Sequence, residues 1–145
     1  MRRINREFNV RIDAIELIRH WMLGAFQIRG QPGPEIRSDV LVAVTEVFVN
    51  FVKHSNLKVE DVIEIQLEFT EEALVIIFKE SGEPFDITEL EDPDLDALHE
   101  SGYGLFIVKS LMDTFEYFPK NSGKAHNITK MTKGYDHGER PNIGG

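Results

Sequence analysis

Residues 45–55 read TEVFVNFVKHS, and this stretch determines how the rest of the chain can be interpreted. Its apolar residues recur at the spacing that gives an amphipathic helix one buried face. Glu46 and Asn50 lie one turn apart, and Lys53 and His54 continue the same side for nearly two further turns. Asparagine is a mediocre helix former, because its side chain competes with the backbone for hydrogen bonds. The position of Asn50 therefore needs another explanation.

Two explanations fit this polar side of the helix. A solvated face is the ordinary one, since charged residues opposite an apolar stripe are common in globular proteins. A functional site is the other, because an amide oxygen is a ligand that Mg²⁺ accepts when phosphates supply further oxygens. A carboxylate one turn away can then take a proton from a hydroxyl nucleophile. The helix pattern alone favours the solvated face, so the choice depends on the rest of the chain.

Strand patterns occur on both sides of this helix. Apolar and polar side chains alternate over residues 7–12 and 63–69, which predicts two half-buried strands. The continuous apolar run 74–78 predicts a central strand that forms a hairpin with the second of these. Two later strands are predicted at TFEYF, residues 114–118, and HNITKM, residues 126–131.

Start and stop signals bound the predicted helices. Asp13, with Glu16 three residues later, predicts a capping box, and Gly30 is expected to end that helix. Pro34 suits the first turn of the central helix, and a third helix opens near Gly104. The resulting order favours the α+β class, a two-layer sandwich in which a mixed, mostly antiparallel sheet is covered on one face by three helices.

The composition indicates one globular domain. The chain has 145 residues, of which 41% are hydrophobic, enough to bury a sizeable core. We expect this domain over residues 1–133 and a flexible tail over residues 134–145, where no periodicity is found. The absence of cysteine excludes disulfides and thiolate metal sites, and no apolar run has the length of a signal peptide or a membrane span. These features predict a soluble, cytoplasmic protein with no membrane partner.

The charge distribution bears on the choice of partner. A net charge of −9 argues against binding to nucleic acid and favours a basic protein partner. The stretch from Ser81 to Val108 contains no lysine or arginine. We expect its acidic part, which contains Pro84 and Pro93 and precedes the third helix, to be a loop with one short helical turn. Such charge is often only solvated, but an acidic flap can also guide a basic partner. Its acidic residues are Glu83, Asp86, Glu89, Glu91, Asp92, Asp94, Asp96 and Glu100.

A second motif, FKESGEPFD, spans residues 78–86 and ends a buried strand in a carboxylate. The carboxylate of Glu80 can accept a hydrogen bond from the exocyclic amine of a purine, and Gly82 lets the ring approach the backbone. A strand end followed by a turn is the simpler interpretation of the same residues.

A third motif, SGYGLFIVKS, places Gly102 and Gly104 before a helix. Free backbone N–H groups at a helix start, unobstructed by side chains, form an anion site that suits phosphate. A flexible joint is the alternative explanation of the glycine pair.

Together, in this order and at these spacings, the three motifs resemble the N, G1 and G2 boxes of the GHKL, or Bergerat-fold, ATPases. The chain resembles in particular the anti-sigma factor serine kinases of bacterial switch modules, over about Phe8 to Lys133. The short lid between G1 and G2, the segment GLFIVKSLMDTFEYF and the terminal MTK carry this part of the resemblance. It implies the Bergerat ATP-binding fold, with ATP and Mg²⁺ as cofactors.

The resemblance also implies a role for each motif. Glu46 corresponds to the base that activates the attacking hydroxyl, and Asn50 to the residue that holds Mg²⁺ against the triphosphate. Glu80 corresponds to the acid that contacts the purine. The other nucleotide-binding residues implied are Lys53, His54, Gly82, Phe85, Gly102, Gly104 and Leu105.

Three positions differ from the family pattern or match it ambiguously. G1 normally presents aspartate, and Glu80 is one methylene longer, which predicts an altered adenine contact. Many relatives have arginine where this chain has Tyr103, so turnover is expected to be slow. A threonine on a late strand supports the adenine pocket in the family, and NIT, residues 127–129, gives no single counterpart for it.

The resemblance implies a protein-serine kinase that binds a sigma factor and phosphorylates a STAS-type anti-anti-sigma antagonist. Homodimers are common in the family, and the exposed edge of the N-terminal strand is one candidate interface. The first alternative is a catalytically weak or inactive nucleotide-binding module that acts in partner switching by protein binding only. A plain ATPase domain without a protein substrate is the second alternative.

Overall fold

The computed structural model describes residues 2–84, 86–89, 103–121 and 123–135. All predicted helices and strands are present, and the short helical turn expected in the acidic stretch is η1. In chain order the elements are β1 (Arg2–Asn9), α1 (Ala14–Arg29), α2 (Pro34–His54), β2 (Val62–Phe69), β3 (Ala73–Glu80), η1 (Ile87–Glu89), α3 (Tyr103–Leu111), β4 (Thr114–Phe118) and β5 (Asn127–Gly134).

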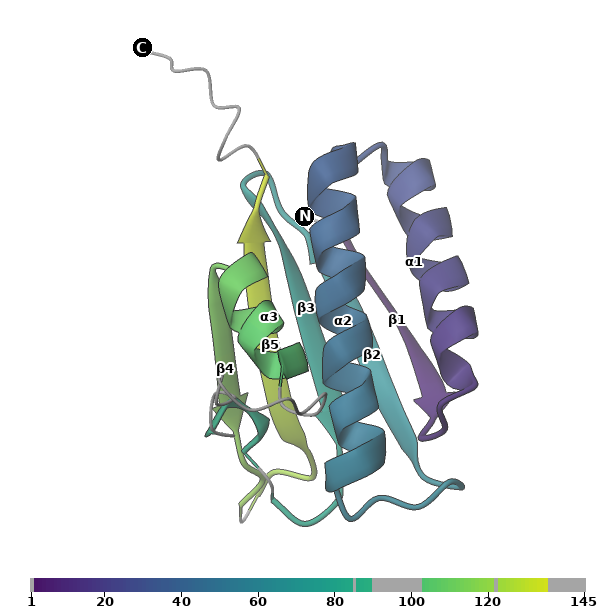
Figure 1. Cartoon of the computed structure of the whole chain (residues 1–145), viewed down its shortest axis with the longest axis vertical. Helices are drawn as coiled ribbons and strands as arrows, with labels where there is room; N and C mark the ends of the chain where they lie inside the picture. The colour runs from purple at the N-terminus through teal and green to yellow at the C-terminus, as the bar shows by residue number, and fades with distance from the viewer. Residues whose placement is uncertain (1, 85, 90–102, 122, 136–145) are drawn as a thin grey trace.

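Five strands form one sheet in the order β1-β2-β3-β5-β4. The three helices lie on one face of this sheet, with α2 between α1 and α3 (Figure 1). The predicted α+β sandwich is therefore confirmed. All four pairings between the described strands are antiparallel, so this part of the chain contains no parallel pair of the kind that a mixed sheet would have.

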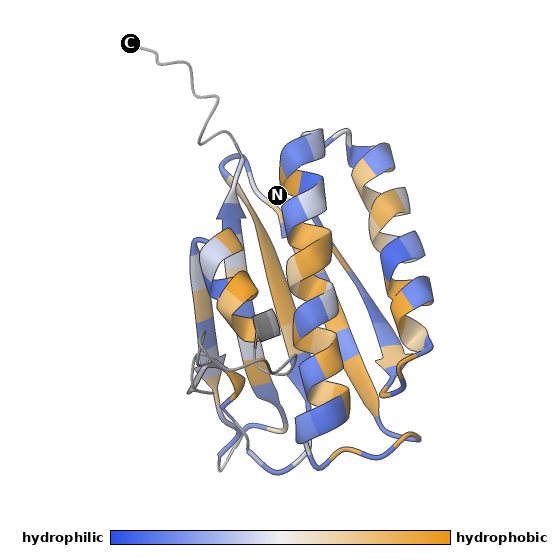
Figure 2. Ribbon diagram, viewed as in Figure 1, coloured by the Kyte–Doolittle hydropathy of each residue, from blue (hydrophilic) through white to orange (hydrophobic). Residues whose placement is uncertain are grey.

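The core lies between the helices and the sheet. β3 is the central strand, and Leu74, Ile76 and Phe78 on its covered face are completely buried. The ring of Phe51 on α2 packs on that of Phe78, with ring centroids 5.8 Å apart. Figure 2 shows the apolar segments of α2 over the strongly apolar strands β2 and β3. This packing fixes α2 over the sheet and so positions the polar side of the helix.

β1 begins and ends earlier than the sequence predicted. It pairs with β2 from Arg2 to Asn9. Its first half was missed because an edge strand has one neighbour and here carries mostly arginine and other polar residues, which hide the alternation. The predicted continuation to Ile12 is wrong, because the chain turns after Asn9: the Arg11 N–H donates to the Asn9 carbonyl at 2.8 Å, and Ile12 is 51% exposed.

α1 begins without the predicted capping box but ends where expected. Asp13 occupies the N-cap position and makes no side-chain cap hydrogen bond. Its Oδ2 instead accepts a hydrogen bond from Arg11 Nη2 at 2.9 Å, so a local ion pair replaces the box. At the other end Gly30 adopts a left-handed conformation with φ of 71°, and its N–H donates to the Phe26 carbonyl.

The last strand continues one residue past position 133, where the domain was expected to end. Gly134 still pairs with Ala73 in the sheet, and the Tyr135 N–H donates to the Glu72 carbonyl at 3.0 Å. Residues 136–145 of the expected tail lie outside the described residues. Among the helices that are described, none combines the length and the hydrophobicity needed to cross a membrane.

Candidate functional site

The second and third helices meet at Glu46. A Cβ atom added to Gly104 would overlap the Glu46 Oε1, so the glycine is needed for the carboxylate to lie against the first turn of α3. The first backbone N–H groups of a helix have no intrahelical partner. The structure therefore places a carboxylate beside a set of backbone donors, as expected if the first and third motifs share one site.

Asn50 lies one turn after Glu46 and is half-buried. Its Nδ2 donates to the Glu46 carbonyl oxygen at 2.8 Å. The side-chain oxygen Oδ1 has no hydrogen-bond partner among the described residues. The helix thus orients the amide and leaves its oxygen available, which is what an oxygen ligand of a hard cation requires.

Lys53 and His54 are exposed in the last turn of α2. This end of α2 and the end of β3 lie at the same end of the molecule, at the bottom in Figure 1. The two residues can therefore contribute positive charge at the margin of the site rather than a buried contact.

Glu80 is the last residue of β3 and is 4% exposed. Its Oε1 accepts hydrogen bonds from the Gly82 N–H at 2.9 Å and from Asn127 Nδ2 at 3.2 Å. Oε2 has no hydrogen-bond partner among the residues that the structure describes. Because Oε2 is not among the fully buried, unpaired side-chain atoms, it reaches solvent and is open to a ligand.

Burial raises the pKa of Glu80 above its ordinary value, since the charged carboxylate loses its hydration. The hydrogen bonds from Gly82 and Asn127 act in the opposite direction, as do the nearby positive charges of Lys120 and His126. The proton affinity of this carboxyl group is therefore set mainly by its burial at the strand end.

Asn127 is a residue of this region that the sequence did not identify. It begins β5 directly opposite Glu80 and is completely buried. Besides its bond to Glu80, its Nδ2 donates to the Gly82 carbonyl at 2.9 Å, and its Oδ1 accepts from the Lys120 N–H at 2.8 Å. The sequence shows only a polar residue at the start of a predicted strand. The register of β3 and β5 is needed to show that Asn127 stands opposite Glu80.

Thr129 lies two residues further along β5, opposite Phe78. It is 1% exposed, and its Oγ1 has no hydrogen-bond partner. Of the two polar residues in NIT, Asn127 is therefore bonded to the strand-end carboxylate, and Thr129 holds an unsatisfied hydroxyl on the covered side of the sheet.

The loop after β3 packs against the chain that follows α2. A Cβ atom added to Gly82 would lie 3.0 Å from Leu57 Cδ2 and 3.2 Å from Glu80 Oε1. Gly104 therefore contacts Glu46 on α2, and Gly82 contacts Leu57 in the chain that follows α2.

Three other predicted positions need separate mention. Phe85 and Gly102 lie outside the described residues. Leu105 is 3% exposed, and its side chain belongs to the hydrophobic core. Its backbone N–H lies in the first turn of α3, which is the part of this residue that a phosphate could contact.

A family model described as "Histidine kinase-like ATPase domain" matches residues 8–133 of the chain. The chain belongs to this family. Its relatives include Serine-protein kinase RsbW from Staphylococcus aureus strains bovine RF122 / ET3-1 and MRSA252. Each is 33% identical to the chain over 129 residues, which cover 82% of the chain and 80% of the relative. Within the histidine kinase-like ATPases, the chain is thus a protein serine kinase of the RsbW kind, which confirms the resemblance seen in the motifs.

Solved structures share the fold of this histidine kinase-like ATPase at low sequence identity. A Mycobacterium tuberculosis protein with RsbU and RsbW domains aligns with a TM-score of 0.63 and 12% identity over 92% of this chain. The chain spans 32% of that longer protein. The histidine kinase domain of a blue-light activated kinase from Erythrobacter litoralis aligns with a TM-score of 0.50 and 15% identity, over 88% of this chain and 62% of that one.

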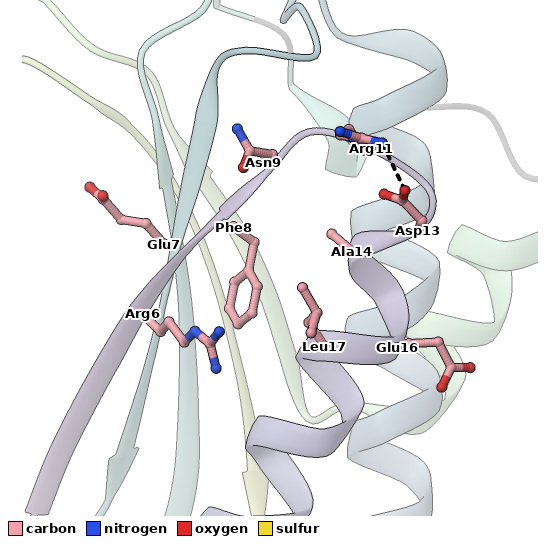
Figure 3. A pocket seen from close by; sticks show the side chains of 9 residues that line it. All are labelled: Arg6, Glu7, Phe8, Asn9, Arg11, Asp13, Ala14, Glu16 and Leu17. Carbon is pink, nitrogen blue, oxygen red and sulfur yellow. Dashed lines mark hydrogen bonds and ion pairs between the residues drawn. The ribbon is translucent and has the colours of Figure 1, made fainter.

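An open pocket elsewhere on this RsbW-like chain contains none of the predicted site residues. It has a volume of about 530 Å³ and lies between β1 and α1, where Phe8 and Leu17 face each other (Figure 3). Arg6 and Glu7 lie on its strand side, and the ion pair of Arg11 and Asp13 closes one end. Because its charges are mixed and partly paired, it shows no preference for an anionic ligand such as a nucleotide.

Proposed function

We propose that the chain binds Mg-ATP between α2, the end of β3 and the start of α3, and transfers the γ-phosphoryl group to a serine of a partner protein. The unpaired oxygens Asn50 Oδ1 and Glu80 Oε2 support this site. The contact between Glu46 and Gly104 carries the proposal, because it sets a carboxylate beside backbone donors that suit phosphate.

The donor set fits a magnesium nucleotide. Asn50 would supply one oxygen ligand through Oδ1, and the first-turn N–H groups of α3 would bind phosphate oxygens. Within the described ranges, no group of three or more histidine, aspartate or glutamate side chains could hold a metal ion by itself. A cation at Asn50 would therefore need phosphate oxygens and water as its other ligands. When bound, Mg²⁺ would neutralise charge on the phosphates.

Glu46 is the proposed general base. Its carboxylate takes the proton of the serine hydroxyl as the serine oxygen attacks the γ-phosphorus, and the bond from this phosphorus to the bridging oxygen of ADP breaks. The products are ADP and phosphoserine. The N–H groups of α3 stabilise the charge on the transferred group, so catalysis depends mainly on positioning and charge neutralisation.

The purine end of the site is assigned to Glu80. Its Oε2, which has no partner among the described residues, accepts a hydrogen bond from the exocyclic amine of adenine. Gly82 is proposed to let the ring approach the backbone, on a side other than the one that Leu57 and Glu80 Oε1 fill. Phe85, Gly102 and Leu105 are proposed as further nucleotide contacts from their positions in the motifs. Lys53 and His54 are proposed to balance the phosphate charge in a chain whose net charge is −9.

The partners follow from the same family membership. We assign to the chain an anti-sigma role, in which it binds a sigma factor and phosphorylates a STAS-type anti-anti-sigma antagonist. A homodimer is also proposed, since β1 stands at one edge of the sheet and has a strand on one side only.

A partner-switching module that binds nucleotide without efficient turnover is the second candidate. The observation that favours it is the environment of Glu80, whose burial raises its pKa and whose Oε1 is held by two donors. Binding of ATP without measurable phosphorylation of any STAS partner would decide for this candidate.

The test of the kinase proposal is Glu46→Gln, which keeps the shape of the side chain and removes the base. Mg-ATP affinity is expected to stay near the wild-type value, while transfer to a STAS-domain serine falls by about 10²–10⁴-fold. Glu16→Gln on the exposed side of α1 is the matched control. Wild-type turnover in Glu46→Gln would remove the base assignment.

Asn50→Ala tests the metal assignment separately. Nucleotide affinity should depend strongly on Mg²⁺ in the wild type, and this dependence should be lost in the variant together with most of the affinity. Titrations in Mg²⁺ and in EDTA measure both. Equal wild-type affinity in the two buffers would contradict a cation at Asn50.

A further inference from the structure

We propose that Asn127 determines the base specificity of the nucleotide site, by occupying one oxygen of Glu80 and so selecting adenine over guanine. The inference rests on the proposed nucleotide site and concerns which base it accepts. It starts from an asymmetry in the buried carboxylate, whose two oxygens are used differently.

A carboxylate offers about two acceptor positions on each oxygen. Both positions on Glu80 Oε1 are taken, by the Gly82 N–H at 2.9 Å and by Asn127 Nδ2 at 3.2 Å. Oε2 has no partner within the part of the chain that is described. The folded protein therefore presents one free oxygen to a ligand rather than two.

Asn127 is fixed in this role by its other bonds. The two hydrogens of its Nδ2 go to Glu80 Oε1 and to the Gly82 carbonyl, and its Oδ1 accepts from the Lys120 N–H. The side chain is completely buried, and all its hydrogen-bonding groups are used. It cannot turn away from the carboxylate without leaving several buried groups unpaired, which is costly.

The two purines differ in what they offer a carboxylate. The Watson–Crick edge of adenine has a donor amine beside an acceptor nitrogen, so one carboxylate oxygen satisfies the amine and a second would meet a lone pair. Guanine presents two adjacent donors, the ring N–H and the amine, and a carboxylate binds both only with two free oxygens. A site with a single free oxygen thus satisfies adenine fully and leaves a guanine donor unpaired, which is the strongest basis for rejecting a ligand.

Asn127→Ala removes the Nδ2 donor and opens an acceptor position on Oε1. We expect the ratio of Mg-GTP to Mg-ATP dissociation constants to move toward GTP by about tenfold, the effect of one hydrogen bond of about 1.4 kcal/mol. Competition against a fluorescent ATP analogue measures both constants. Asn127→Ser, which keeps a donor of shorter reach, should shift the ratio in the same direction by less, and it replaces the alanine variant if that variant does not fold.

Lys120→Met is the matched control. The Nζ of Lys120 donates to the Ser81 carbonyl at 2.7 Å. The substitution therefore removes a hydrogen bond between the loop after β3 and the loop after β4, but it leaves Glu80 Oε1 occupied. The loss of the Lys120 charge near Glu80 affects both nucleotides, so the individual affinities can change while their ratio should stay at the wild-type value. Thermal unfolding of each variant shows that the ratio is compared between folded proteins.

The outcomes separate this inference from the proposed function. Equal affinity of the wild type for ATP and GTP, or an unchanged ratio in a folded Asn127→Ala protein that binds ATP, would overturn the role of Asn127 and leave the nucleotide site standing. A wild-type protein that binds neither nucleotide would overturn both. A ratio that changes as much in Lys120→Met as in Asn127→Ala would show that loop attachment, rather than the carboxylate oxygen, sets the preference.

Discussion

The two ends of the sheet bury different kinds of groups. At one end, which we call the aromatic end, the rings of Phe26 and Phe69 meet edge to face with centroids 6.3 Å apart. The guanidinium groups of Arg29 and Arg37 lie 5.7 Å and 5.9 Å from the centroids of these rings. Large apolar surfaces are buried here, and the part-buried guanidinium group of Arg37 donates to the carbonyl oxygens of Pro32 and Phe26.

The other end, which we call the carboxylate end, buries Glu80 and Asn127 instead. Burial of the charged Glu80 carboxylate costs folding free energy, and one of its oxygens has no partner among the described residues. Stability and the proposed ligand recognition are therefore separated along the length of the sheet. Changes at the aromatic end should affect unfolding, and changes at the carboxylate end should affect binding.

Phe26→Ala should produce the largest effect. The side chain is completely buried, so its loss leaves a cavity and should lower the free energy of unfolding by about 3–5 kcal/mol. Urea unfolding measures this. Ile28→Ala, at a position that is 82% exposed on the same helix, should change it by less than about 0.5 kcal/mol. Similar effects in both variants would contradict the distinction between the ends.

Gly104→Ala should affect catalysis rather than stability. The new methyl group would displace the Glu46 carboxylate, and phosphoryl transfer should fall at least about tenfold, or roughly 1.4 kcal/mol in the barrier. Gly24→Ala is the matched control, because a Cβ added there on α1 meets nothing within 4 Å. Equal transfer rates in both variants would show that Glu46 is not held by this contact.

Glu80→Gln should stabilise the protein while removing adenine binding. The pKa of Glu80 is raised by burial, so the folded state binds its proton more tightly than the unfolded state, and stability falls as pH rises through the unfolded and then the folded pKa. Glutamine avoids this loss, so the variant should gain roughly 1 kcal/mol near neutral pH and nothing below the unfolded pKa.

Urea unfolding of Glu80→Gln and of the wild type across a pH series measures this difference. The side-chain carbonyl of glutamine can still accept hydrogen bonds from Gly82 and Asn127. Its NH₂ group then takes the position of Glu80 Oε2, where it repels the amine of adenine because both groups are donors. A stability difference that does not depend on pH would contradict the buried carboxylate as its source.

Arg3→Ala should have the smallest effect. The Arg3–Glu68 pair, at 3.5 Å, joins the edge strand β1 to β2, and because Arg3 is exposed we expect it to contribute less than about 0.5 kcal/mol. Glu68 also keeps its hydrogen bond from Gln66 Nε2 at 3.0 Å. Unfolding at low and high salt should show little change in either condition, and a loss above about 1 kcal/mol would mean that the edge contributes more than the comparison of the two ends assumes.

The sequence predicted the architecture because its periodic patterns agree with its breakers. Pro34 and Gly30 mark helix limits that the structure confirms. The prediction of β1 was wrong at both ends, since a turn after Asn9 cannot be seen in an alternation that runs on to Ile12. Such a turn depends on hydrogen bonds that the pattern of side chains does not encode.

The candidate site could be predicted only in part. Glu46, Asn50 and Glu80 were selected as candidates because each belongs to a short motif. Asn127 was missed, because its role depends on standing opposite Glu80 in the sheet, and strand register between segments so far apart is not readable from either segment alone. The unsatisfied hydroxyl of Thr129 was missed for the same reason.

The bond between Glu80 and Asn127 joins residues 47 positions apart, and it has a consequence for the order of assembly. During synthesis β3, which ends in Glu80, emerges well before β5, which carries Asn127. Long-range pairing of this kind forms late. Until β5 docks, the acid has no buried partner and can remain hydrated. The carboxylate end, where we propose that the purine binds, is therefore completed last, so a chain that stops short of β5 should lack the proposed nucleotide site even where its helices have formed.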